Sequence, residues 1–339
     1  MKYTEQDSKE STKLVGLKYV SDDVPGITRI KKGKLFIYKD VDGKVIKNRA
    51  TLKRIQSLAI PPAYTHVWIC PDERGHIQAT GRDDRKRKQY KYHPKWNETR
   101  DETKYHKLLL FGQSLPAIRK QVKKDLKLPK LPKEKVLATI VTLIEKTFIR
   151  VGNDEYAKNN KTYGLTTMQD RHAKVHAGII KFHFKGKSGV THEVTVDNPQ
   201  LAEIVKKCQD LPGQELLQYI DEDKQVRDIT STDVNDYLRN ITGEDFTAKD
   251  FRTWHGTLLA ITELNSYPQS EIKKEIKHNL LSAIECVARN LGNTKAISKK
   301  CYIHPSVLDF YSNGTFFQHM KSKHFKNDED MVLKFLANK

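Results

Sequence analysis

The chain has 339 residues, enough to bury a substantial core and to form about two domains. Lys plus Arg number 61 against 42 Asp plus Glu, and the net charge of +19 indicates a polyanion such as nucleic acid as the partner. No apolar run approaches the roughly 18 residues of a membrane span, and the charged start at Met1–Ser11 does not fit a secretory signal.

Charge alone does not exclude a merely soluble, lysine-rich protein. The four cysteines are scattered and form no Cys-x-x-Cys pair, which fits a reducing interior and argues against a disulfide framework or a zinc site. His172 and His176 are four apart, but no third ligand is near, so a solvated helix face is expected there. We therefore expect no metal, no cofactor and no membrane contact.

The first hundred residues predict strands. Leu35–Tyr38, His66–Cys70 and His76–Thr80 are short β-rich runs separated by turns such as Asp42-Gly43. This pattern predicts an antiparallel sheet in a small domain, residues 1–104. From about Asp101 the pattern becomes helical, which predicts a mainly helical domain over residues 105–339. The fold class is therefore α+β.

A basic and aromatic run ends the β-rich part. Residues 82–93 include Arg82, Lys88, Gln89, Tyr90 and Tyr92. Arg and Lys suit phosphates, while Gln and Tyr can reach base edges or sugars, so the run favours contact with nucleic acid. A solvated charged loop is the alternative.

Arg150 follows an apolar helical stretch, Val136–Phe148. An arginine among apolar neighbours is costly unless it has a partner. The partner is either a structural carboxylate or a bound anion, and this segment alone favours the structural ion pair.

Gly186-Lys187-Ser188 stands in the turn of a predicted hairpin between 179–184 and 192–196. The P-loop pattern Gly-x-x-x-x-Gly-Lys would need a glycine where Lys181 stands, and it would need a helix after the loop. An ATP-binding loop is therefore excluded. A hairpin lysine can instead swing onto a bound substrate as a proton donor, although it is more often a solvated turn residue.

Thr247 and Asp250 form a capping box, which predicts a helix from about Ala248. Arg252 then lies in its first turns, near an end that favours anions. A surface ion pair is the alternative, but Phe251 and Trp254 should pin this helix into the core.

Tyr302 ends the lysine-rich segment 291–302. A phenol with basic neighbours suits covalent attack on a nucleic-acid phosphate. Because an unperturbed phenol has a pKa of about 10, other residues must stabilise the negative charge that develops on the phosphate.

Together these segments resemble the small type IB DNA topoisomerases of poxviruses, giant DNA viruses and bacteria, most closely the bacterial-type branch. The resemblance runs from about Gly26 to about Tyr311. It rests on seven segments: residues 67–71, 78–83, 87–90, 149–153, 186–189, 249–253 and the final tyrosine segment.

The resemblance implies a reaction and a site. Tyr302 would form a 3′-phosphotyrosyl link and free a 5′-hydroxyl, so that a nicked duplex relaxes supercoils of both signs and is resealed without ATP or metal. Arg150 and Arg252 would hold the non-bridging oxygens, and Lys187 would protonate the leaving oxygen. Asn293 stands where poxviral enzymes have a histidine; it can donate a hydrogen bond to phosphate but carries no charge, and the alternative is a helix cap.

The resemblance also implies double-stranded DNA as the partner, bound by a monomer that clamps the duplex, inside the cell and not secreted. Its DNA-reading positions match Gln89, Tyr90 and Tyr92 in the sheet, with Asn153 and Tyr156 after Arg150.

Two other functions remain open. Tyrosine recombinases share this chemistry, but their second motif usually reads His-x-x-Arg, whereas Lys249 precedes Arg252 here. A DNA-binding protein with a decayed active site is the other, and the intact set Arg150, Lys187, Arg252 and Tyr302 argues against it.

Overall fold

The computed structural model describes residues 12–13, 15–33, 35–84, 86–320 and 324–337, without the side chains of 97–104, 106, 155, 156, 159 and 188. The chain forms two compact units, Met1–His106 and Lys107–Lys339, each with its own hydrophobic core. The predicted boundary after residue 104 stays a prediction, because helix α3 (Pro94–Asp125) runs through it without a break.

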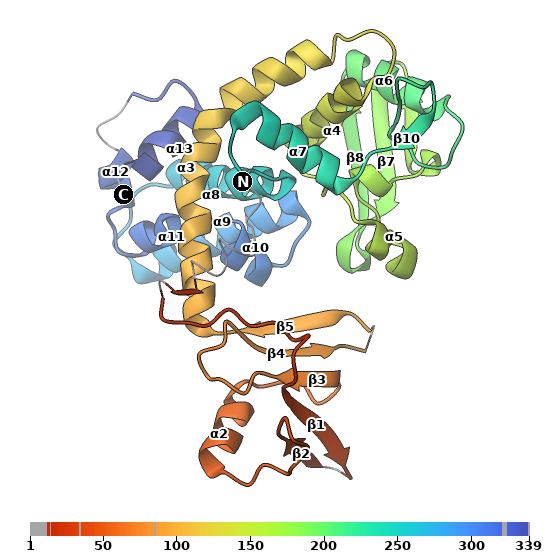
Figure 1. The fold of residues 1–339 in the computed structure, drawn as a ribbon. Coiled ribbons are helices and arrows are strands. Elements are labelled where there is room, and N and C mark those ends of the chain that lie inside the picture. The colour runs from red at the N-terminus through yellow and green to blue at the C-terminus, as the bar shows by residue number, and fades with distance from the viewer. Residues whose placement is uncertain (1–11, 14, 34, 85, 321–323, 338–339) are drawn as a thin grey trace. The chain divides into compact units, whose positions relative to one another are not determined.

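The first unit is built on a five-stranded antiparallel sheet with the strand order β2-β1-β3-β4-β5 (Figure 1). Its strands are β1 (Ile27–Lys32), β2 (Leu35–Lys39), β3 (Thr65–Ile69), β4 (Ile77–Arg82) and β5 (Lys88–Tyr92). Val67 and Ile69 lie on the same face of β3, are buried, and pack with Ile55 of helix α2 (Arg49–Ser57). The predicted antiparallel sheet is therefore confirmed.

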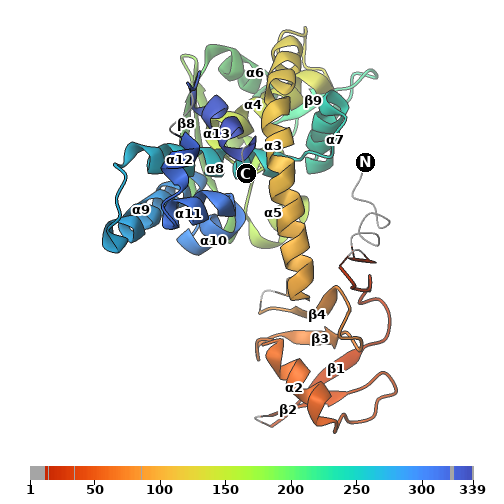
Figure 2. The same ribbon diagram turned by 90° about the vertical axis from the view of Figure 1, so that its left-hand side faces the viewer.

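The second unit is mainly helical, as predicted. After α3 its helices are α4 (Lys133–Thr147), α5 (Asp154–Asn160), α6 (Pro199–Gln209), α7 (Ser231–Thr242), α8 (Ala248–Ser266), α9 (Lys273–Leu291), α10 (Lys295–Cys301), α11 (Pro305–Ser312), α12 (Phe316–Met320) and α13 (Asp328–Ala337). Figure 2 shows α8 lying among α9, α11 and α13. Three helices follow Tyr302 within the described residues.

Helix α8 begins where its capping box predicted. Asp250 accepts hydrogen bonds from the backbone nitrogen and the hydroxyl of Thr247, at 2.8 and 2.9 Å. Phe251 and Trp254 are fully buried and make edge contacts with Phe111 of α3. These contacts fix α8 in the core, so the side chains of its first turns have a rigid support.

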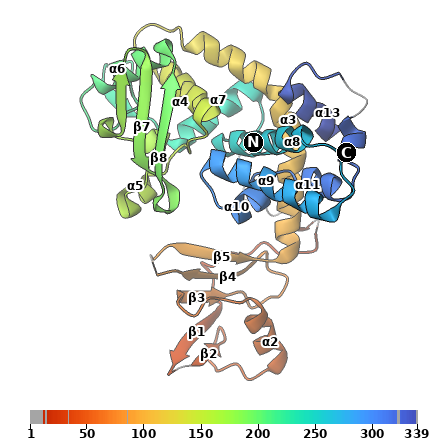
Figure 3. The same ribbon diagram turned by 180° about the vertical axis from the view of Figure 1, so that it is seen from behind.

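The second unit also contains a three-stranded antiparallel sheet with the order β6-β7-β8. Its strands are β6 (Ala173–His176), β7 (Ile179–Lys185) and β8 (Thr191–Asp197), and a separate pair consists of β9 (Gln218–Ile220) and β10 (Val226–Asp228). Figure 3 shows this sheet beside α4 and α6. The predicted hairpin is β7–β8. The helix expected at His172 and His176 is wrong, because these residues lie in a 3-10 turn and in β6.

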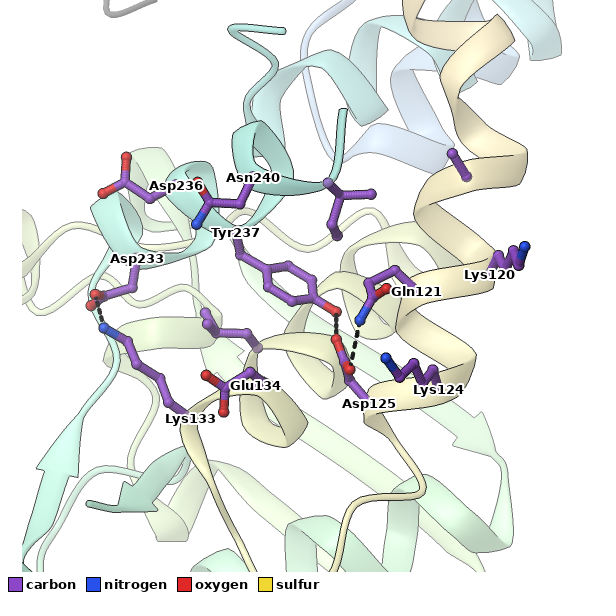
Figure 4. A pocket seen from close by; sticks show the side chains of 13 residues that line it. Lys120, Gln121, Lys124, Asp125, Lys133, Glu134, Asp233, Asp236, Tyr237 and Asn240 are labelled. Carbon is purple, nitrogen blue, oxygen red and sulfur yellow. Dashed lines mark hydrogen bonds and ion pairs between the residues drawn. The ribbon is translucent and has the colours of Figure 1, made fainter. Parts of the chain in front are cut away.

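Polar contacts tie α3, α4 and α7 together around a cavity (Figure 4). The buried carboxylate of Asp125 accepts hydrogen bonds from Tyr237 at 2.7 Å and from Gln121 at 2.8 Å. Lys133 and Asp233 form an ion pair of 2.5 Å at the facing ends of α4 and α7. Because Asp125 is satisfied by its neighbours, this cluster holds the helices together.

None of the helices in the described part of the chain is long and apolar enough to cross a bilayer. No group of three or more His, Cys, Asp or Glu side chains is placed there to hold a metal ion.

Candidate active site

Tyr302 lies directly after α10 and against α8. Its backbone nitrogen donates to the carbonyl of Ser298, and its carbonyl accepts from the hydroxyl of Thr257 at 3.4 Å. A Cβ atom at Gly256 would clash with that carbonyl, so the glycine allows the close approach. The side chain of Tyr302 is buried. The position of the phenol is therefore set by α8 as well as by its own helix.

Arg252 projects from α8 beside the phenol. Its Cζ lies 5.1 Å from the centre of the Tyr302 ring. Its Nη1 donates to the carbonyl of Phe148 and its Nη2 to that of Leu291 at 2.6 Å. Burial, and then the charge of Arg150, lower the pKa of Arg252 to about 10, so the guanidinium stays charged at neutral pH.

Arg150 and Asn293 meet from distant segments. Helix α4 ends at Phe148, whose left-handed backbone (φ 57°) turns the chain towards Arg150. Arg150 Nη2 donates to Oδ1 of Asn293 at 2.5 Å. The side chain of Thr294 caps α10, and the C-cap of α9 is Gly292. The backbone nitrogen of Asn293 donates to the carbonyl of Ala288 in the last turn of α9 at 2.9 Å, whereas its side chain faces Arg150.

Lys187 lies in the short turn between β7 and β8. Gly186 and Val190 close the turn with a hydrogen bond of 2.7 Å, and the left-handed Gly189 (φ 81°) completes it. The Lys187 side chain is exposed and has no ion-pair partner among the described residues. Its ammonium is therefore free to reach a bound group.

The cationic side chains described above line one small cavity of about 170 Å³, and Arg289 lines it as well. Arg150, Lys187 and Arg252 come from three separate segments, and the one carboxylate on the lining is Glu193. Two buried donors, Nε of Arg252 and Nδ2 of Asn293, have no hydrogen-bond partner in the described part of the chain. Arg252 lines the cavity, and Asn293 follows the lining residue Gly292 in the sequence. Buried donors without partners in these places are what a phosphate would satisfy.

The electrostatics of the site favour the phenolate. Burial raises the pKa of Tyr302, but the positive charges of Arg252, Arg150 and Lys249 outweigh burial and leave the pKa below its usual value. The sequence analysis did not count Lys249 as a site residue. Its spacing of three from Arg252 on one helix was the signal that could have identified it.

The sequence analysis also missed His192 and Arg289, which line the cavity from β8 and from the last turn of α9. The period of two in β8 could have indicated His192, because it shares the inward face of the strand with Val194 and Val196.

The predicted DNA-reading residues of the first unit lie on β4 and β5. Lys88, Tyr90 and Tyr92 alternate along β5, and the two tyrosine rings stack at 5.7 Å. Lys88 forms an ion pair with Asp22 at 2.8 Å, which raises the pKa of the lysine. Two further side chains bind locally: Arg82 donates to the carbonyl of Lys86, and Gln89 donates to Asp83. Any contact of Lys88 with phosphate must therefore compete with Asp22.

The other two predicted DNA-reading residues belong to the second unit. Asn153 is exposed just before α5. Tyr156 lies within α5, but its side chain is outside the described residues.

The chain is similar to known proteins over most of its length. Residues 90–328 match the model of the catalytic core of eukaryotic DNA topoisomerase I, and residues 35–83 match the N-terminal domain of bacterial DNA topoisomerase IB. The DNA topoisomerase 1B of Acanthamoeba polyphaga mimivirus is 34% identical over 92% of this chain and 95% of its own. That of Vaccinia virus (strain Copenhagen) is 24% identical over 84% and 90%. A XerH recombinase structure matches with a TM-score of 0.35 at 15% identity over 56% of this chain and 49% of its own, which is too low to bear on the fold.

Proposed function

The chain belongs to the type IB DNA topoisomerases, and we propose that it nicks and reseals one strand of duplex DNA through Tyr302. The observation that carries this proposal is the convergence of Arg150, Lys187 and Arg252 on one cavity, with the Tyr302 ring against Arg252. The cavity supplies the charges that a transferring phosphate needs, and the phenol supplies a nucleophile.

The cleavage step is an in-line displacement at phosphorus. Tyr302 releases its phenolic proton to water, and the phenolate oxygen forms a bond to phosphorus while the bond from phosphorus to the 5′-oxygen breaks. Arg150 and Arg252 stabilise the non-bridging oxygens, and Asn293 donates to one of them through Nδ2. The Lys187 ammonium gives its proton to the leaving 5′-oxygen.

The product of this step explains relaxation. The 3′-phosphotyrosyl link replaces one phosphoester with another, so the bond energy is conserved and resealing needs no ATP. The freed 5′-hydroxyl end can rotate about the intact strand, and supercoils of either sign relax. Reversal of the same step, with Lys187 now accepting the proton, reseals the strand.

DNA is the partner, and we propose that a monomer encloses the duplex and acts where the cell holds its DNA. In the first unit, DNA would bind to the face of β5 that carries Lys88, Tyr90 and Tyr92. The second unit offers the cationic cavity with Asn153 and Tyr156 nearby in sequence. The net charge of +19 also favours binding to the phosphates of a duplex.

The test is relaxation of plasmid DNA in the presence of a metal chelator and without nucleotide. Positively and negatively supercoiled plasmids should both relax. If a folded protein relaxed neither sign, the proposed function would be wrong. If it joined two separate duplexes at a defined site, the protein would act as a recombinase instead.

A further inference from the structure

His192 lies between two segments that carry active-site residues. It is half-buried on β8 and stacks on the ring of Phe184 at 5.2 Å with 14° between the planes. A Cβ atom at Gly186 would lie 2.6 Å from Cδ2 of His192, and a Cβ atom at Gly292 would lie 2.6 Å from Cε1. One imidazole ring therefore touches both glycines, with no room for a methyl group at either contact.

These two glycines directly precede Lys187 and Asn293. Gly292 is left-handed (φ 59°), so its backbone alone favours glycine. Gly186 has φ −91°, a conformation that any residue adopts, so its backbone gives no reason for glycine. The ring of His192 supplies that reason, because a side chain at Gly186 would displace it.

The ring is suited to act as a neutral spacer. Burial, followed by the charges of Arg150 and Arg252, lowers the pKa of His192. A neutral imidazole can lie near two guanidiniums without repelling them. No hydrogen bond to its ring nitrogens is found among the described residues, so stacking and shape hold the ring in place.

We propose that His192 is a positioning residue that holds the Lys187 turn against the Gly292–Asn293 turn, so that the Lys187 ammonium reaches the leaving 5′-oxygen. This proposal rests on the proposed function, in which Lys187 is the proton donor. The turn is exposed at the end of a hairpin, and the β7–β8 ladder does not fix it to the helices. A displacement of about 1 Å can slow a positioned reaction by about a hundredfold.

Cleavage of two otherwise identical duplexes tests the proposal, one with oxygen and one with sulfur at the 5′ leaving position. A thiolate leaves without a proton, because thiols are far more acidic than alcohols. Lys187→Ala should therefore slow single-turnover cleavage of the oxygen duplex far more than that of the sulfur duplex. His192→Ala should show the same selectivity, with at least a tenfold loss on oxygen, on the order expected for partial loss of acid catalysis.

The outcomes separate the two proposals. If Lys187→Ala slowed both duplexes equally, Lys187 would not be the proton donor and the proposed mechanism would be wrong at that step. Lys187→Ala could slow mainly the oxygen duplex while His192→Ala slowed both duplexes equally, or neither. In that case only the role of His192 would be overturned.

Two further variants separate the ring's shape from its chemistry. His192→Phe keeps a flat ring and should recover most of the cleavage rate; a loss as large as in His192→Ala would contradict the spacer role. Gly186→Ala should slow cleavage in the native chain but have little effect in His192→Ala, where the methyl group has room. Additive losses would also contradict the spacer role.

His183→Ala is the matched control on the same hairpin, because the His183 side chain is 71% exposed. It should leave both cleavage rates unchanged. Thermal unfolding of each variant should show that the chain still folds, so that a lost rate can be assigned to the site.

Discussion

Arg150 donates a hydrogen bond to Asn293 at 2.5 Å, and this contact joins the end of α4 to the turn between α9 and α10. The bond fixes the amide through Oδ1. Its Nδ2 is buried and has no partner among the described residues, so it is the group left to bind a phosphate oxygen. In the proposed mechanism the amide therefore binds Arg150 through Oδ1 and the substrate phosphate through Nδ2.

Asn293→Asp should therefore be more harmful than Asn293→Ala. The alanine removes one phosphate donor, a change that costs about a hundredfold in rate at comparable sites. The aspartate would also bind Arg150 as an ion pair and place a negative charge beside the phosphate. Single-turnover cleavage measures both, with Asn293→His as a variant that keeps a donor. An aspartate variant faster than the alanine variant would contradict this role.

Arg252→Lys should lose both activity and stability. A single ammonium cannot reach the carbonyls of Phe148 and Leu291 and still face the phosphate. We expect cleavage to slow by about 10²–10³-fold, and the free energy of unfolding to fall by about 1–3 kcal/mol because a buried carbonyl loses its donor. Arg227→Lys, at a position that is 57% exposed and lies outside the lining of this cavity, is the control. Near-normal cleavage by Arg252→Lys would refute the assignment.

Lys249→Gln should move the pH dependence of cleavage. Burial raises the pKa of Tyr302, but the positive charges of Arg252, Arg150 and Lys249 lower it by more than burial raises it. The phenol therefore loses its proton at a lower pH than usual. Removal of one positive charge raises this pKa, so the rise of rate with pH should shift to higher pH. Rates between about pH 6 and pH 11, a range that includes the ordinary tyrosine pKa of about 10, measure the shift. The exposed Lys273→Gln should leave the profile unchanged, and a shift to lower pH in Lys249→Gln would contradict the account.

His255 should make the fold sensitive to mild acid. Burial is the main cause that lowers the pKa of His255 to about 4. The unfolded chain binds this proton near pH 6.5, so between about pH 6.5 and pH 4 the unfolded state holds more protons and the free energy of unfolding falls as pH decreases. His255→Phe should lose less stability than the native chain between about pH 7 and pH 5 in denaturant titrations. An equal loss would show that His255 does not contribute.

Local chemistry explains why much of the fold could be predicted from the sequence. The Thr247–Asp250 capping box predicted the start of α8, and the two runs 179–184 and 192–196 around the glycine-containing turn predicted the β7–β8 hairpin. His172 and His176 misled, because a spacing of four is compatible with a helix but does not require one. Their neighbours form a turn and an edge strand instead.

Only the site residues that lie in recognisable sequence motifs could be predicted from the sequence. Arg150, Lys187, Arg252, Asn293 and Tyr302 stand in recognisable segments, and the first three line one cavity. His192 was missed because its role depends on two glycines that are distant in sequence from each other. The ion pair of Lys88 with Asp22 was missed because the two residues are far apart in the sequence. Contacts between separate segments leave no local pattern.

The most direct test of the central claim is to trap the cleaved DNA. A duplex labelled at the 5′ end of the cleaved strand should become covalently attached to the native protein in the presence of a chelator, and the attached peptide should contain Tyr302. Tyr302→Phe should still bind the duplex but leave no covalent adduct. An adduct that persisted in Tyr302→Phe, or a 5′ label found only on a released fragment that ends in a 3′-hydroxyl, would contradict the account.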